Sequence, residues 1–260
     1  MFTAVTIIGI LFAIVIHEFA HGYVMYRYGV EIAEAGIGVG KGIIPHFYVR
    51  WRNIPIKISV LLIGGYVMPS EQGNQQIKAL DYRKQSDIYG AGVYSNVIFC
   101  LLMGNLAFLI RPNVIFLGSY LMYFDFIIIP LLLFRRTFCR YFVPVVGSVL
   151  LGYILYLMFV NGPTSAVGGP ATIVKMSVVE AVADWRISLS DAFSRIATIS
   201  LAIGLFNMIP LIPLDGGRIV LSWINAMKKE RMANAFSAVG VFMFFALILL
   251  AITSDVLSFT

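Results

Sequence analysis

Long apolar runs dominate the chain, and most polar residues collect in the segments between them. A helix needs about 20 predominantly apolar residues to cross a lipid bilayer. Pro210 and Pro213 interrupt one of these runs, so we expect a discontinuous helix there. The pattern therefore predicts an α-helical polytopic membrane protein with about six membrane spans, at residues 2–28, 90–110, 113–134, 141–160, 196–214 and 234–254.

The segment that follows the first run has a different pattern. Residues 30–70 carry β-branched and aromatic residues in partial alternation, with glycines and prolines between them, and this predicts a small membrane-associated β-sheet. The end of the segment, from Leu61 to Pro69, is too apolar for a strand edge in water. We expect it either to form a re-entrant hairpin beside the membrane-embedded core or to lie on the lipid headgroups.

The order of these segments predicts a single membrane-embedded domain over residues 1–260, without internal repeats. Its core would consist of the spans 2–28, 90–110 and 196–214 together with the β region 30–70. Residues 113–160 would add a helical pair, and residues 234–254 would form a final span. Val174 to Val182 have the pattern of an amphipathic helix on the outer membrane surface.

The composition excludes an ordinary soluble domain. Hydrophobic residues make up 60% of the chain and charged residues 12%, whereas soluble domains are about half apolar and about a quarter charged. The net charge is +6, but there is no basic stripe interleaved with aromatic residues, so nucleic acid is not an expected partner. Cys100 and Cys139 are the only cysteines, too few for a disulfide framework or a cysteine zinc site.

Two of the three histidines lie in the pentapeptide His17-Glu18-Phe19-Ala20-His21, inside the first apolar run. Residues four apart stack on one face of a helix, so both imidazoles can reach one metal ion, with Glu18 beside them to take a proton from water. Ionisable groups inside a membrane span are costly and are functional by default. A polar cluster that only holds helices together would not need His, Glu and His at this spacing.

A catalytic zinc ion takes three protein ligands and keeps one position open, so a third ligand must come from elsewhere in the chain. His46 is one candidate, although its Pro-flanked, aromatic-rich surroundings are also typical of an interfacial histidine. Asp215 is the preferred candidate, because the two prolines before it would stop the helix near the depth of His17. The glycines at 216 and 217 permit the bend that follows.

The pairing of His-Glu-x-x-His in one span with Asn-x-x-Pro and Leu-Asp-Gly in a later one resembles the site-2 protease family of intramembrane zinc metalloproteases. Gly64 to Val67 resembles the re-entrant β segment of that family. Gly92 to Asn96 resembles its Gly-Pro-x-x-Asn motif, with Val93 in place of the proline. Gly169-Pro170 resembles the Gly-Pro before its last core helices, and Ile212 stands where many members have a second proline.

The resemblance implies that His17, His21 and Asp215 bind Zn²⁺ and that Glu18 acts as general base and acid. It also implies that the substrate is shaped or held by a further set of residues: Asn96, Asn207, Pro210, Gly64, Gly65 and Tyr66. The departures from the family motifs touch neither a metal ligand nor Glu18, so they affect only the expected backbone path around the substrate. We expect a compact form without the PDZ or nucleotide-binding regulatory domains that other members carry.

The expected function is that of a zinc-dependent endopeptidase that hydrolyses peptide bonds within or near membrane spans, in regulated intramembrane proteolysis or in the clearance of signal-peptide remnants. Its expected partners are a membrane-spanning protein substrate and the lipid bilayer. The alternative is a multi-pass metal-ion transporter that uses the His, Glu and Asp cluster as a translocation site. Transporters usually have repeated halves, which this sequence lacks, and a transport site has no need for Glu18.

The distribution of basic residues predicts the orientation in the membrane. Segments 29–88, 135–140 and 215–233 together hold fourteen Lys and Arg residues, and the segments on the opposite side hold four. By the positive-inside rule the basic side is cytosolic, which places both termini outside the cell (inner) membrane. His17 then lies about 15 Å from the inner end of its helix, so the active site is expected within the membrane, towards the cytosol.

Overall fold

The computed structural model describes residues 2–38, 45–52, 54–59, 64–111, 133–161 and 185–257. Within these residues, five helical segments are long and apolar enough to cross a membrane. They are α1 (Phe2–Arg27), α3 (Tyr82–Ile110), the segment that begins at Arg135, α8 (Trp185–Met208) and α10 (Glu230–Leu257). This confirms the predicted class of polytopic helical membrane protein.

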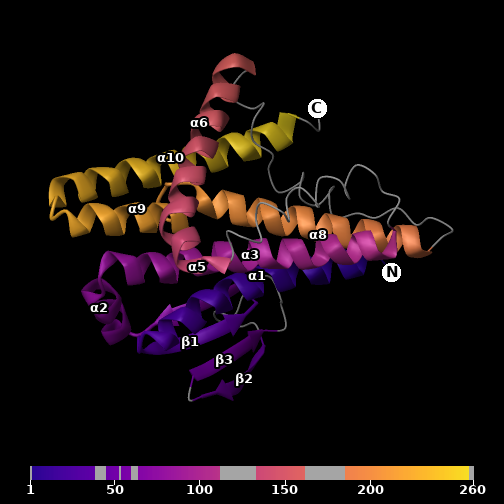
Figure 1. The fold of residues 1–260 in the computed structure, drawn as a ribbon, viewed down its shortest axis with the longest axis horizontal. Coiled ribbons are helices and arrows are strands. Elements are labelled where there is room, and N and C mark those ends of the chain that lie inside the picture. The colour runs from indigo at the N-terminus through magenta and orange to yellow at the C-terminus, as the bar shows by residue number, and fades with distance from the viewer. Residues whose placement is uncertain are drawn as a thin grey trace.

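The segment from Arg135 is built of three consecutive pieces. A short helix, α5 (Arg135–Thr137), leads through the π-helical turn η1 (Phe138–Phe142) into α6 (Val143–Asn161). Helices α1, α3 and α8 pack against one another with their axes roughly aligned, whereas α6 crosses them at a steep angle (Figure 1). A buried cluster of Val93, Val97, Phe138, Met208 and Ile219 joins α3, the π-helical turn, α8 and the following helix.

Three of the predicted spans have the wrong bounds. The span predicted at 141–160 already begins at Arg135, in α5 and the π-helical turn. The second helix begins at Tyr82 rather than at residue 90, with the Asp81 side chain accepting hydrogen bonds from the first turn. The predicted span 196–214 is wrong at both ends, because α8 begins at Trp185 and ends at Met208. Residues 209–214 form an apolar connection, and α9 (Asp215–Ala226) then begins a new helix.

The connection of residues 209–214 is apolar because several of its side chains are buried, although it is not part of a membrane-spanning helix. Ile209, Leu211 and Leu214 pack with Leu247 of α10 in a second core cluster, so a hydropathy run continues past the end of α8. The predicted interruption at Pro210 is thereby confirmed as a break between two helices. Residues 113–132 of the predicted span 113–134, the motif at Gly169-Pro170 and the amphipathic helix at 174–182 lie outside the described residues.

The predicted sheet is confirmed and has four strands: β1 (Ile32–Ile37), β2 (His46–Trp51), β3 (Ile54–Ser59) and β4 (Gly65–Pro69). The strand order is β2-β3-β1-β4, with β1 and β3 parallel and the other two pairs antiparallel. Strand β4 packs against α1: a Cβ at Gly22 would lie 3.1 Å from the Val67 side chain. The sheet thus lies beside the helix that carries the His-Glu-x-x-His motif (Figure 1).

A short helix, α2 (Glu71–Ala79), connects the sheet to α3. The Ser70 hydroxyl oxygen accepts a hydrogen bond from the Gly73 backbone N–H at 2.9 Å and caps its first turn, as serine commonly does at a helix start. The last strand and α3 are therefore joined by ordered structure, which places both β4 and α3 next to α1.

Candidate metal centre

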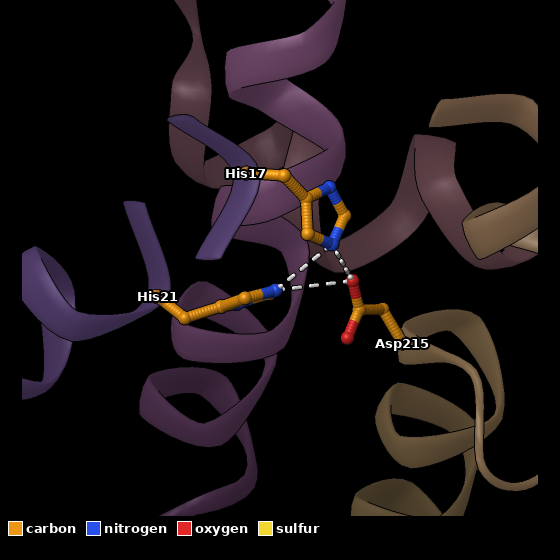
Figure 2. Close-up of side chains that lie close together, drawn as sticks. All are labelled: His17, His21 and Asp215. Carbon is orange, nitrogen blue, oxygen red and sulfur yellow. Dashed lines mark hydrogen bonds and ion pairs between the residues drawn. The ribbon is translucent and has the colours of Figure 1, made fainter. Parts of the chain in front are cut away.

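Three buried side chains converge between α1 and α9. His17 Nε2 lies 3.2 Å from His21 Nε2, and the Asp215 Oδ2 atom lies 3.1 Å from the first and 3.2 Å from the second. Figure 2 shows the three polar tips pointing at one another. All three residues are at least nine-tenths buried, and each offers a ligand atom within 4.8 Å of the others. The structure thus brings together the three side chains predicted as metal ligands.

The arrangement fits a bound cation. The Nδ1 atom of His21 lies 2.7 Å from the carbonyl oxygen of Ile88. Because a carbonyl only accepts, Nδ1 carries the hydrogen, and in the neutral ring Nε2 then keeps its lone pair. That lone pair faces a carboxylate oxygen, which also only accepts. Such groups repel one another unless a positive charge lies between them. Two imidazoles and a carboxylate are also the donor set of a catalytic zinc site with one open position.

Helix geometry and a close helix contact position the two histidines. The four-residue spacing stacks His17 and His21 on one face of α1, and α3 packs against that face. Gly92 lies at the contact, where a Cβ would overlap Nε2 of both imidazoles. Any larger residue would therefore displace the ligands, which explains why glycine stands at this point of α3.

Asp215 is positioned by tight packing of the connection before it. The backbone turns through hydrogen bonds from Leu211 N–H to the Ile209 carbonyl oxygen and from Leu214 N–H to the Leu211 carbonyl oxygen, both 2.8 Å. A Cβ on Gly216 would overlap the Met208 carbonyl, and so would a Cβ on Gly147 of α6. Helix α6 therefore lies directly on the end of α8 and supports the connection that presents the carboxylate.

Glu18 follows the first ligand on α1 and points to a different side of the helix. It is half-buried, and strand β4 begins beside it: a Cβ at Gly65 would lie 3.6 Å from Glu18 Cγ and 3.5 Å from Val15 Cα. The Glu18 side chain therefore lies beside the start of β4, on the same helix as the two histidine ligands.

The substrate residues suggested by the resemblance fall in three places. Asn96 is fully buried one helical turn beyond Gly92, and its side-chain amide has no hydrogen-bond partner in the described part of the chain. Asn207 donates to the Ile203 carbonyl oxygen at 3.0 Å, near the end of α8. Pro210 lies in the connection to α9, two residues after the last residue of α8.

The β-segment residues lie near Glu18 but not among the ligands. Gly64 precedes β4 with a φ of +91°, a left-handed conformation that favours glycine, and Gly65 opens the strand. The Tyr66 hydroxyl donates to the Glu34 carboxylate on the neighbouring strand β1. Burial and this hydrogen bond to Glu34 raise the pKa of the Tyr66 hydroxyl, so this hydroxyl is already used within the sheet.

His46, the other candidate third ligand, does not join the metal centre. It is exposed on the edge strand β2, where its ring packs edge-on against Tyr48. The alternative of His46 as third ligand is therefore wrong in this structure, and the interfacial interpretation of this residue agrees with its exposure.

Several contributors to the site are absent from the sequence predictions. The Ile88 carbonyl is a backbone group, which every residue type carries, so it could not be recognised from the sequence. Asp87, the residue before it, accepts two hydrogen bonds from Arg140 of the π-helical turn, at 2.9 and 2.7 Å, and one from Tyr28 at 2.6 Å. A buried carboxylate so close to an apolar run could have been recognised as meaningful, but the predicted span began after it.

Comparison with known proteins agrees with this picture. The model of the family described as Peptidase family M50 matches residues 5–251. A protein of Vibrio cholerae serotype O1 named "Putative zinc metalloprotease" is 32% identical over 117 residues, which cover 40% of this chain and 24% of that protein. A Streptococcus pneumoniae protein of similar name is 31% identical over 94 residues, 35% of this chain and 22% of the relative.

The matches to these two relatives span less than a quarter of their length. The family match, in contrast, extends over nearly the whole chain and includes both the His-Glu-x-x-His helix and Asp215. The resemblance on which the sequence motifs converge is thereby confirmed: the chain belongs to peptidase family M50, the site-2 protease family.

Proposed function

We propose that this protein is a zinc-dependent endopeptidase that cleaves peptide bonds within or near the membrane spans of other proteins. The observation that carries the proposal is the convergence of His17, His21 and Asp215 next to Glu18, on a helix long and apolar enough to cross a membrane. Membership of peptidase family M50 supports the same chemistry.

The residues of the chain divide the chemistry between them. Zinc, when bound by the three ligands, supplies Lewis acidity that activates water near neutral pH and polarises a peptide carbonyl. Glu18 is the general base that takes a proton from the water and the general acid that returns it to the leaving amine. Its position beside the ligands, outside the ligand set, suits this role.

Strand β4 is the proposed template for the substrate. A peptide bond in a helix is protected by its own backbone hydrogen bonds, so the substrate must be held extended to be cleaved. Within the described part of the sheet, β4 pairs only with β1 and forms one edge. An extended peptide that adds to this edge would pass the Gly65 end of the strand, and this end lies against Glu18.

Asn96 of α3 is proposed as a second substrate contact, in addition to strand β4. Its buried amide has no hydrogen-bond partner among the described residues. The amide can donate to a carbonyl and accept from an amide N–H, which an extended peptide presents together. Asn207 and Pro210 remain predicted substrate contacts, because both lie close to the apolar connection that presents Asp215.

The proposed location is the cell (inner) membrane, with both termini outside and the metal centre towards the cytosol. The excess of Lys and Arg in segments 29–88, 135–140 and 215–233 supports this orientation. The metal centre then lies about 15 Å below the cytosolic end of α1, at a depth that a membrane-spanning substrate can reach.

The proposal is tested by comparing the purified wild-type protein with Glu18→Gln. Both proteins should contain zinc, because Glu18 is not a ligand, and only the wild type should cleave a single-span model peptide in detergent or liposomes. Zinc in both proteins without cleavage by either would contradict the proposal. Metal uptake into proteoliposomes without peptide cleavage would point instead to transport.

A further inference from the structure

A groove with a volume of about 610 Å³ runs between α1 and α3. The α1 side is formed by one face of the helix between Ile16 and Tyr28, and the α3 side by one face between Ala91 and Leu102. This volume is typical of sites that hold a small molecule. The groove lies beside the metal centre but contains none of its ligands.

One part of the groove is apolar and open to the side. Ile16 contributes from α1, while Ile98 and Leu102 of α3 are 43% and 52% exposed. Both helices are candidate membrane spans, so these exposed apolar side chains face the hydrocarbon of the bilayer or whatever occupies the groove.

The other end of the groove is strongly basic. Arg27 at the end of α1 and Arg135 and Arg136 at the start of the next described segment line it. The last two are electrostatic neighbours of the Tyr28 hydroxyl, which marks the same end. The nearby buried carboxylate of Asp87 is already satisfied by Arg140 and Tyr28. Among the described residues, none of the three groove arginines forms an ion pair.

We propose that this groove binds one anionic phospholipid, with its phosphate at the arginine end and an acyl chain along Ile16, Ile98 and Leu102. The distance from Tyr28 to Ile16 along α1 is about 18 Å at 1.5 Å per residue, close to the hydrocarbon depth of one leaflet, which is about half of 30 Å. A single basic end on an apolar groove of this length is complementary to one lipid molecule. Basic clusters at the cytosolic ends of spans attract anionic headgroups.

The test compares lipid binding by two double variants of the full chain. Arg135→Gln/Arg136→Gln removes two charges from the groove, and Lys229→Gln/Arg231→Gln removes two exposed charges between α9 and the first turn of α10. Binding of phosphatidylglycerol and of phosphatidylcholine is measured by native mass spectrometry at graded lipid concentrations. Each basic side chain near the membrane surface contributes about fivefold in affinity, so the groove variant should lose about thirtyfold for phosphatidylglycerol.

The same variant should lose clearly less affinity for phosphatidylcholine, because the charge of its phosphate is balanced by its own choline group. The control variant should bind both lipids normally. A third variant, Ile98→Trp, fills the apolar part of the groove and should weaken the binding of both lipids to a similar extent. Unchanged phosphatidylglycerol binding by the groove variant would overturn the proposal, and so would an equal loss in the control variant, which would indicate diffuse attraction.

A photo-crosslinking residue at position 98 identifies the occupant directly. In liposomes that contain both phosphatidylglycerol and a single-span model peptide, it should attach to the lipid. Attachment to the peptide alone would assign the groove to the substrate and would also overturn the proposal. Neither measurement requires catalysis, so the lipid site and the proposed peptidase activity can fail independently.

Discussion

His21 is held by a backbone atom of a different helix: its Nδ1 lies 2.7 Å from the carbonyl oxygen of Ile88 on α3. The hydrogen bond fixes the tautomer of the neutral ring, in which Nε2 presents its lone pair to His17 and Asp215. Metal-binding histidines are commonly oriented in this way through their second ring nitrogen. The position of α3 against α1 therefore decides whether the two histidines can bind one ion.

Gly92→Ala should weaken zinc binding while the protein stays folded. The added Cβ would overlap both imidazoles, which must turn away from their common point or force α3 outwards. We expect zinc affinity to fall by at least about tenfold, the lower end of what changes next to metal ligands cost. Zinc content after dialysis against graded chelator concentrations measures the effect.

Gly152→Ala is the matched control for this variant. Gly152 also lies in a helix, α6, but a Cβ there would meet nothing within 4 Å. Alanine favours a helix over glycine, so this variant should keep its zinc and its thermal stability. Equal zinc loss in both variants would mean that the contact at Gly92 does not position the ligands.

Asp215→Asn and His46→Ala together decide the third ligand. The first change keeps the size of the side chain but removes the charge that lies 3.1 and 3.2 Å from the two imidazoles. Its zinc affinity should fall by more than the 10- to 100-fold typical of changes outside the ligand set. His46→Ala should retain full zinc content, because this residue is exposed on β2.

The opposite result, with zinc lost from His46→Ala and kept by Asp215→Asn, would reject the centre described here. Both variants should elute as the wild type does in size-exclusion chromatography, which separates loss of zinc from loss of fold.

The site could be predicted from sequence where its geometry is local or its chemistry rare. The spacing of His17 and His21 is enough to place both on one helix face, and a carboxylate after two prolines in an apolar run is unusual enough to nominate Asp215. Ile88 could not be predicted, since any residue carries the same carbonyl. The support that Gly147 of α6 gives to the end of α8 depends on helix packing, which hydropathy does not encode.

The helix bounds show the same limit. Helix α3 begins eight residues before the predicted span, because Arg83, Lys84 and Asp87 are helical without being apolar. The connection after Met208 is apolar without being helical, since its side chains fill a core cluster. Hydropathy therefore locates the segments that are buried in protein or lipid. It does not locate the helix ends, because these depend on capping and tertiary packing.

Losing one member of the buried ion pair between Asp87 and Arg140 should destabilise the fold around the site. Asp87 is fully buried and the Arg140 side chain is 18% exposed, so Asp87→Ala leaves a nearly buried cation without its partner. Removing one member of a buried pair typically costs about 3 to 5 kcal/mol, and we expect the lower end here because water reaches Arg140. Thermal unfolding in detergent, followed with and without zinc, measures the loss.

The double variant Asp87→Leu/Arg140→Met should recover most of that stability, because no unpaired charge then remains. Arg231→Met, at an exposed position on α10, serves as the control and should change stability little. If the double variant is as unstable as Asp87→Ala, the loss reflects packing around α3 rather than the missing ion partner.

Asn96→Leu separates a structural role of the buried amide from a substrate role. An amide without a partner in a buried site costs stability, so a leucine of similar size should leave the folded protein as stable as the wild type or more so. If Asn96 holds the substrate, cleavage of a single-span model peptide should nevertheless fall by about 10²- to 10³-fold, the cost of losing one donor to a developing oxyanion.

Asn105→Leu is the control variant and should cleave normally. Asn105 lies on the same helix, but its amide donates to the Leu101 carbonyl. Stability lost together with activity at Asn96 would show that the amide finds its partner within the fold, and the substrate contact would then have to come from Asn207.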